Sequence, residues 1–137
     1  MTTELTVPPR KEFQSFHDLP IVTDLDNIEA DVAILGIPFS DPYSMEEVTN
    51  DQTNAPTSIR RFCQRALRGI ERWDFDVGGQ IFDGKDIRVV DVGDIPGDPR
   101  DMGSHYKKAE QVVRKLLAKN VMPIVLGGDH GIPIPVM

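Results

Sequence analysis

Hydrophobic residues form three nearly continuous runs along the chain. Residues 32–39 read VAILGIPF, residues 87–94 read IRVVDVGD, and residues 121–128 read VMPIVLGG. Apolar runs of this length, without strict alternation, are typical of strands that are covered on both faces of a parallel sheet. The sequence therefore predicts three buried strands.

Two stretches between these runs show apolar residues at helical spacing. The first covers 56 to about 70 and begins at Pro56, because proline is favoured at the first helical position. The second covers about 104 to 119, with Ser104 as the expected N-cap and Asn120 as a left-handed stop. This helix and the strands on either side of it make a βαβ unit, so we expect an α/β fold.

Three segments lack this patterning. Residues 1 to about 30 are polar and acidic and contain several prolines, which predicts an N-terminal arm that is partly ordered at best. The segment 40–55 is a long polar loop, and loops of this length are usually functional or mobile. Residues 73–86 contain Gly-Gly and Asp-Gly pairs, which predict turns between short extended pieces.

Composition narrows the classes of partner. The chain has 137 residues, with 15 Lys and Arg against 22 Asp and Glu and a formal charge of -7. The absence of a basic cluster argues against nucleic-acid binding, and no apolar run approaches the ~20 residues of a membrane span. A small cationic ligand fits this charge better. The single cysteine, Cys63, and the absence of a signal or transit pattern favour a reducing, cytoplasmic location.

The sharpest candidate site follows the last predicted strand, which runs into Gly127, Gly128, Asp129 and His130. Ligands of parallel α/β sheets bind at the carboxyl ends of the strands. An imidazole placed there beside carboxylates suits a metal ligand or a general base. The alternative is a glycine-rich turn with a capping aspartate and a structural histidine, and these residues alone leave both open.

Other polar residues are weaker candidates. Asp91 and Asp94 end the second predicted strand, where they could line the crevice or cap loops. His17 and His105 are expected to be solvated surface residues, since one lies in the polar arm and the other in the first turn of a helix. Cys63 lies on the apolar face of a helix, which favours a core position over a nucleophile.

Four motifs occur in an order that resembles one family. They read DVAILGIPF, APTSIRRF, RVVDVGDIP and NVMPIVLGGDHGIPIPV. Together they are similar to the N-terminal part of the ureohydrolases (arginase, agmatinase, guanidinobutyrase), over roughly residues 20–137. The resemblance implies a three-layer α/β/α fold with a mostly parallel sheet, incomplete at the C-terminus. In this interpretation residues 31–137 are a truncated domain that follows the arm, residues 1–30.

The resemblance also implies a chemistry. Ureohydrolases use a dinuclear centre, usually two Mn²⁺ ions, to turn a bridging water into hydroxide that attacks a guanidinium carbon and releases urea and an amine. His130 matches the first metal ligand of the family, Asp129 accompanies it, and Gly128 and Gly131 line the site. Nickel or another divalent metal is a further option. The implied substrate is a small cationic guanidino compound such as agmatine or guanidinobutyrate, and the implied assembly is a homo-oligomer, a trimer or hexamer.

This chain departs from the family pattern. Neither an Asp-x-His-x-Asp nor an Asp-x-Asp-x-x-Asp segment, the sources of the remaining ligands, occurs in it, and Gly131 stands where a serine is common. One imidazole cannot hold two divalent cations. The strand at 121–126 would also leave an unpaired, hydrophobic sheet edge.

These departures leave three hypotheses. The first is an N-terminal ureohydrolase fragment that is inactive by itself. The second is a non-catalytic subunit or interaction module derived from such an enzyme. The third is an unrelated small α/β binding domain in which the Gly-Gly-Asp-His sequence is only a turn.

Overall fold

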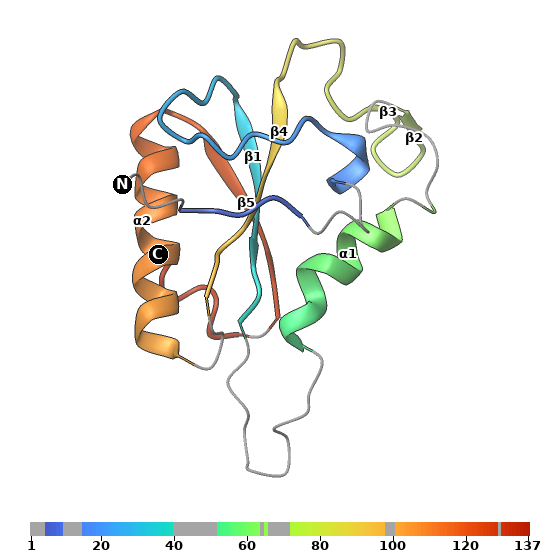
Figure 1. The fold of residues 1–137 in the computed structure, drawn as a ribbon. Helices are drawn as coiled ribbons and strands as arrows, with labels where there is room; N and C mark the ends of the chain where they lie inside the picture. The colour runs from blue at the N-terminus through green and yellow to red at the C-terminus, as the bar shows by residue number, and fades with distance from the viewer. Residues whose placement is uncertain are drawn as a thin grey trace.

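A parallel sheet lies at the centre of the computed structural model of this chain (Figure 1). The structure describes residues 5–9, 15–39, 52–63, 65, 72–97, 101–128 and 130–137. The sheet has the strand order β4-β1-β5. Its strands are β1 (Val32–Ile37), β4 (Val89–Asp94) and β5 (Met122–Gly127). The three predicted strands and the α/β class are therefore confirmed.

Strand β1 occupies the middle of the sheet. Its first residue, Val32, is aligned with Val89 of β4 on one side and with Met122 of β5 on the other, and both pairings are parallel. Every residue of β1 after Val32 is buried. A central strand has neighbours on both edges and helices over both faces, which explains why its sequence is apolar without alternation.

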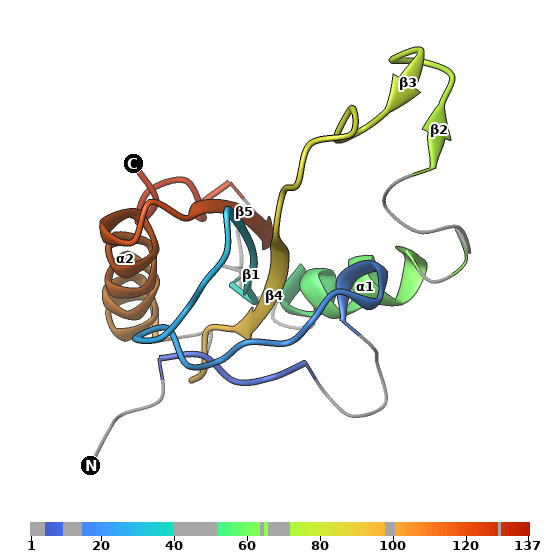
Figure 2. The same cartoon turned by 90° about the horizontal axis from the view of Figure 1, so that it is seen from above.

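Helix α2 (Met102–Ala118) covers one face of the sheet and α1 (Ala55–Cys63) lies on the other (Figure 2). The larger core joins the α2 side chains Ala109, Val112, Val113 and Leu116 to the sheet residues Ala33, Leu35, Val90 and Val92. A smaller cluster on the other face contains Ile34, Val89 and Leu126, with Ile59 of α1 packed against it. The described residues thus form the three layers that the resemblance implies.

The start of α2 differs from the prediction. Asp101, not Ser104, is the N-cap, and its carboxylate accepts the backbone N–H of Ser104 at 3.2 Å. A carboxylate three residues ahead of that amide satisfies one of the free N–H groups of the first turn, so the helix begins earlier than the apolar spacing suggests. The predicted stop is confirmed, because Asn120 has a φ of 58° in the left-handed region.

Helix α1 presents a different buried face from the one that the apolar spacing predicts. Its fully buried residues are Pro56 and Arg60. Phe62, expected on the apolar face, is 68% exposed, so this part of the prediction is wrong. The predicted continuation of the helix towards residue 70 lies outside the described residues, except for residue 65, and so does most of the long loop, residues 40–51.

The described residues of the expected N-terminal arm lie along the outer edge of β4. Val7 bridges Asp94 in antiparallel fashion, and Ile21 bridges Asp91 in parallel fashion. Further along the same segment, Leu25 is 4% exposed and belongs to the larger core. These isolated bridges close the outer edge of β4 without forming a regular strand.

A short hairpin links α1 to β4. Strands β2 (Trp73–Asp74) and β3 (Gly79–Gln80) pair antiparallel, and Gly78 turns the chain with a φ of 71°. This confirms the predicted turns between extended pieces. Figure 2 shows that the hairpin stands away from the sheet and from α1.

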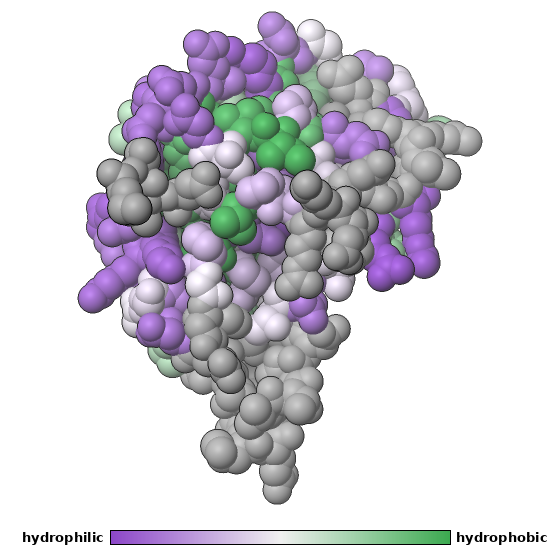
Figure 3. Space-filling model, viewed as in Figure 1, coloured by the Kyte–Doolittle hydropathy of each residue, from purple (hydrophilic) through white to green (hydrophobic). Residues whose placement is uncertain are grey.

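The described surface includes charged residues at one end of α2 and an open apolar edge at β5. Figure 3 shows hydrophilic residues at the upper left, near the C-terminal end of α2 and the turn before β1. Lys115 of α2 pairs with Asp26 at 2.7 Å. On the outer strand β5, Met122 and Ile124 are 57% and 44% exposed, and no described strand pairs beyond it. No helix among the described residues is long and apolar enough to cross a membrane.

Gly93 is where the N-terminal segment constrains β4. The register between β1 and β4 shifts at this point, Gly93 has a φ of 82°, and a Cβ there would overlap the Val7 carbonyl. That carbonyl accepts the N–H of Asp94 at 2.9 Å. Any larger residue would therefore strain the backbone and displace the bridge.

We expect Gly93→Ala to lower the free energy of unfolding by about 2 kcal/mol or more, because the left-handed conformation alone disfavours a side chain by about 1–2 kcal/mol. Urea denaturation measures the difference. The matched control is Gly103→Ala, since an added Cβ on this α2 residue meets no atom within 4 Å. This control should be neutral or stabilising by up to about 1 kcal/mol. Equal midpoints for Gly93→Ala and wild type would contradict the described bridge.

Candidate functional site

The carboxyl ends of the three strands lie together at one end of the sheet (Figure 1). Strand β1 leads to the buried Phe39, β4 ends at Asp94, and β5 ends at Gly127. A parallel α/β sheet places its ligand crevice at this end. The predicted site residues at the ends of β4 and β5 are therefore brought to the same edge.

A buried ion-pair network stabilises the carboxyl end of β4. Arg60 of α1 donates from Nε to Asp91 Oδ2 at 2.8 Å and from Nη2 to Asp91 Oδ1 at 2.9 Å. Its Nη1 donates to Asp94 Oδ1 at 2.6 Å. Arg60 and Asp91 are fully buried, whereas the Asp94 side chain is 16% exposed. The two-pronged guanidinium thus joins both carboxylates to the helix.

Asp91 is also hydrogen-bonded to the backbone. Its Oδ2 accepts the N–H of Phe16 at 2.9 Å, and its Oδ1 accepts the N–H of Gly93 at 2.9 Å. With the two bonds from Arg60, four donors surround this carboxylate, which matches its acceptor capacity. Such complete pairing offsets the desolvation of buried charges.

Arg60 remains a cation in this setting. Burial alone would lower the pKa of its guanidinium, but the hydrogen bonds to Asp91 and the charges of Asp94 and Asp91 outweigh it and raise that pKa above its ordinary value. Asp91 and Asp94, weak site candidates in the sequence, are thus structural partners of Arg60. The sequence offered one signal for Arg60, because it lies one helical turn after Pro56, the first expected helical residue.

The strongest sequence candidate, His130, lies in a turn directly after β5 and is exposed. Gly128 and Gly131 on either side are half-buried, and Asp129 lies outside the described residues. Within the described part of the chain, no group of three or more His, Cys, Asp or Glu side chains could hold a metal ion. The described residues therefore do not fit a dinuclear metal centre by themselves.

His105 contradicts its prediction as a surface residue. It is 1% exposed, and its ring stacks on Phe39 with centroids 5.9 Å apart and an interplanar angle of 27°. Neither ring nitrogen has a hydrogen-bond partner among the described residues. Burial, and then the charge of Lys108, lowers the pKa of His105 below its ordinary 6.5. The buried His105 ring is therefore neutral, because a buried imidazolium without an acceptor is unfavourable.

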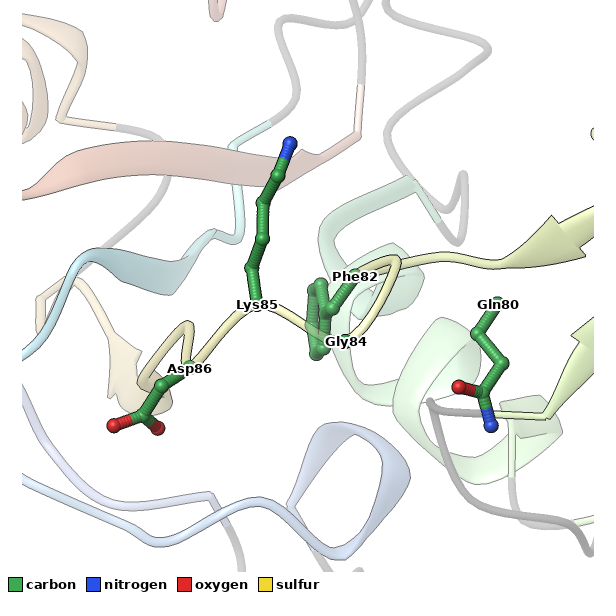
Figure 4. A pocket seen from close by; sticks show the side chains of 5 residues that line it. All are labelled: Gln80, Phe82, Gly84, Lys85 and Asp86. Carbon is green, nitrogen blue, oxygen red and sulfur yellow. The ribbon is translucent and has the colours of Figure 1, made fainter.

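Cys63 and a small surface pocket lack the features of a reactive or binding site. Cys63 is half-buried, and burial raises the pKa of its thiol, which disfavours the reactive thiolate. A small pocket of about 160 Å³ lies beside the β3–β4 connection. Figure 4 shows that the polar side chains lining it, Gln80, Lys85 and Asp86, point in different directions and do not converge on a ligand.

Comparison with known proteins identifies the relatives of this arrangement. The sequence model of the arginase family matches residues 30–137. The chain is 25% identical to a mitochondrial agmatinase of Gallus gallus over 98% of its own length and 38% of the relative. It is 27% identical to a guanidinobutyrase of Pseudomonas aeruginosa over 87% of its length and 35% of the relative.

A solved structure agrees with these matches. Proclavaminate amidino hydrolase from Streptomyces clavuligerus superposes with a TM-score of 0.67 and 27% identity, covering 95% of this chain and 40% of that one. The chain thus spans well under half the length of each of these relatives.

The first prediction from the site concerns Arg60. Replacing it by methionine leaves two carboxylates without their cation in the interior, so Arg60→Met should lower the free energy of unfolding by about 3–5 kcal/mol. Arg60→Lys should lower the free energy of unfolding by less, because lysine keeps the positive charge and loses only the two-pronged hydrogen-bonding geometry. The control Arg65→Met changes an exposed arginine, so its free energy of unfolding should stay within about 0.5 kcal/mol of the wild-type value. Equal urea midpoints for Arg60→Met and Arg65→Met would contradict the network.

The second prediction concerns pH. The pKa of His105 is lower in the folded chain than the 6.5 of an ordinary histidine, so the unfolded state binds more protons as the pH falls below about 6.5 and folding loses stability there. His105→Phe keeps an aromatic ring against Phe39 and removes this titration. Urea denaturation between pH 7 and pH 5 should show a smaller loss of stability for the variant than for wild type. Parallel losses would show that His105 does not carry this pH dependence.

Proposed function

The chain belongs to the arginase family, and we propose that it is the N-terminal part of a metal-dependent ureohydrolase that is inactive by itself. The observation that carries the proposal is the position of His130. It follows β5 at the carboxyl end of the parallel sheet, within the residues 30–137 that match the family's sequence model.

In this proposal His130 supplies one ligand of the metal centre. Its exposed imidazole stands free of the core, in a turn that two glycines precede. Enzymes of the family generally depend on manganese, and nickel or another divalent cation is compatible with an imidazole ligand. A catalytic metal needs about three protein ligands, so the remaining ligands must come from residues beyond the described set. Asp129, Gly128 and Gly131 would line the same edge.

The substrate class follows from the relatives. Agmatinase and guanidinobutyrase are both named for guanidino compounds, so we propose a small cationic guanidino substrate for the complete protein. Its reaction would release urea and an amine. We also propose that the complete protein is a cytoplasmic homo-oligomer, as is usual for ureohydrolases.

One observation favours the second candidate, a non-catalytic subunit derived from such an enzyme. The outer strand β5 exposes Met122 and Ile124 beside an edge with no described partner. An apolar edge of this kind is suited to pairing with another chain. The two candidates differ in whether the missing ligand segments exist in the same gene.

We expect no urea release from agmatine or 4-guanidinobutyrate when the 137-residue chain is incubated with Mn²⁺. The Pseudomonas aeruginosa guanidinobutyrase in the same assay is the positive control. The coding sequence downstream of Met137 should contain the two Asp-rich ligand segments. Turnover by the chain alone at a rate like that of the control would overturn its proposed inactivity, and a downstream sequence without the segments would favour the non-catalytic subunit.

A further inference from the structure

Gly127, the last residue of β5, lies where a larger residue would have no room. A Cβ at this position would overlap Cδ1 of Ile132 and would lie 3.0 Å from its Cγ1 and 3.2 Å from its Cγ2. Gly127 is not among the described glycines with a positive φ, so its backbone conformation would permit a side chain. The glycine is therefore required by the space that the Ile132 side chain occupies.

This contact joins the end of β5 to the core. Gly127 is aligned with Ile37 of the central strand β1. Ile132 is 7% exposed and belongs to the larger core. Only residues 128–131 lie between the two in the sequence. A connection this short has few conformations when both of its ends are held, so the contact between Gly127 and Ile132 restricts its path.

Ile132 is also held from its C-terminal side. The N–H of Ile134 donates to the Gly131 carbonyl at 3.2 Å, and the N–H of Val136 donates to the Pro133 carbonyl at 3.1 Å. Val136 packs against the larger core as well. Isoleucine is β-branched and has few χ1 rotamers, so its side chain does not easily swing away from the strand end.

His130 lies within this connection, two residues before Ile132. Its side chain is exposed, so packing around its own ring does not fix its place. A side chain that binds a ligand has to be held within about 0.5 Å of its working position by the residues that support it. Among the described residues, the anchored ends of the connection supply that support for His130.

We propose that Ile132, seated against Gly127, is a positioning residue for His130. Ile132 acts only through the connection between β5 and the core and touches no ligand itself. Its size sets how closely the chain returns to the end of β5, and thereby where the imidazole lies at the carboxyl end of the sheet. The use of that placement rests on the proposed function, in which His130 is a ligand of the metal centre.

Nuclear magnetic resonance of the 137-residue chain, at one fixed pH and without added metal, tests the proposal. The wild type should show a nuclear Overhauser effect between the Hα protons of Gly127 and the δ-methyl group of Ile132. The Cε1–Hε1 signal of His130, assigned by its loss in His130→Gln, reports the surroundings of the imidazole. Gly127→Ala should shift this signal, because the added methyl group displaces Ile132 and the connection with it.

A second substitution separates positioning from general destabilisation. Ile132→Val removes Cδ1, the atom that the added Cβ would overlap, and keeps a β-branched core side chain. By itself it should shift the His130 signal little. Combined with Gly127→Ala, it should return that signal most of the way to its wild-type position. A merely structural role of Ile132 predicts instead that the effects of the two changes add.

Two matched variants serve as controls. Gly103→Ala adds a Cβ that meets no atom within 4 Å, and Ile134→Val trims an isoleucine that is 61% exposed. Neither should shift the His130 signal. If Gly127→Ala alone does not fold, the wild-type Overhauser effect and the double variant still decide the test.

Three results would each overturn the proposal: no Overhauser effect between Gly127 and Ile132 in the wild type, an unshifted His130 signal in folded Gly127→Ala, or no recovery of the signal in the double variant. No metal or substrate is present in these measurements. A failure of the proposed reaction, which the urea assay measures, would therefore leave them unchanged.

Discussion

The buried guanidinium of Arg60 is the interaction on which the carboxyl edge of this sheet depends. It connects α1 to both aspartates of β4, and Asp91 in turn holds the backbone at Phe16. One cation thus joins a helix, a strand and the N-terminal segment. Because these charges are removed from water, any element that moved away would leave a buried charge unpaired. The three elements therefore stabilise one another in the folded chain.

This network also explains why two positions at the edge are glycine. A side chain at Gly36 of β1 would overlap the Asp94 carboxylate that Arg60 holds in place. Gly93 turns with a positive φ where the Val7 carbonyl approaches β4. The Asp91 side chain accepts the Gly93 N–H, so the same carboxylate that pairs with Arg60 shapes this irregular point of the strand. The strand end is thus built around the ion pair.

Structural features that depend on a local sequence pattern could be predicted from the sequence. The apolar run of β1 and the left-handed Asn120 were predictable because burial and backbone conformation depend on neighbouring residues. The environments of Arg60 and His105 depend on residues distant in sequence. Arg60 is hydrogen-bonded to Asp91, 31 positions away, and the His105 ring stacks on Phe39. Residue spacing along each helix therefore did not assign either side chain to the interior. For the candidate site, sequence placed His130 correctly after β5 but left its metal role a prediction.

At the carboxyl end of the sheet, the β4 side and the β5 side differ in whether their strand edges and charged groups have partners among the described residues. On the β4 side, the bridges of Val7 and Ile21 occupy the outer strand edge, and Arg60 neutralises the buried carboxylates. On the β5 side, the strand edge has no described partner, and the exposed His130 lies beyond it. On the β4 side, Arg60, Asp91 and Asp94 stabilise the fold, because they are already hydrogen-bonded to one another. A ligand at this end of the sheet would therefore find its ionisable group on the β5 side, where the imidazole of His130 is exposed.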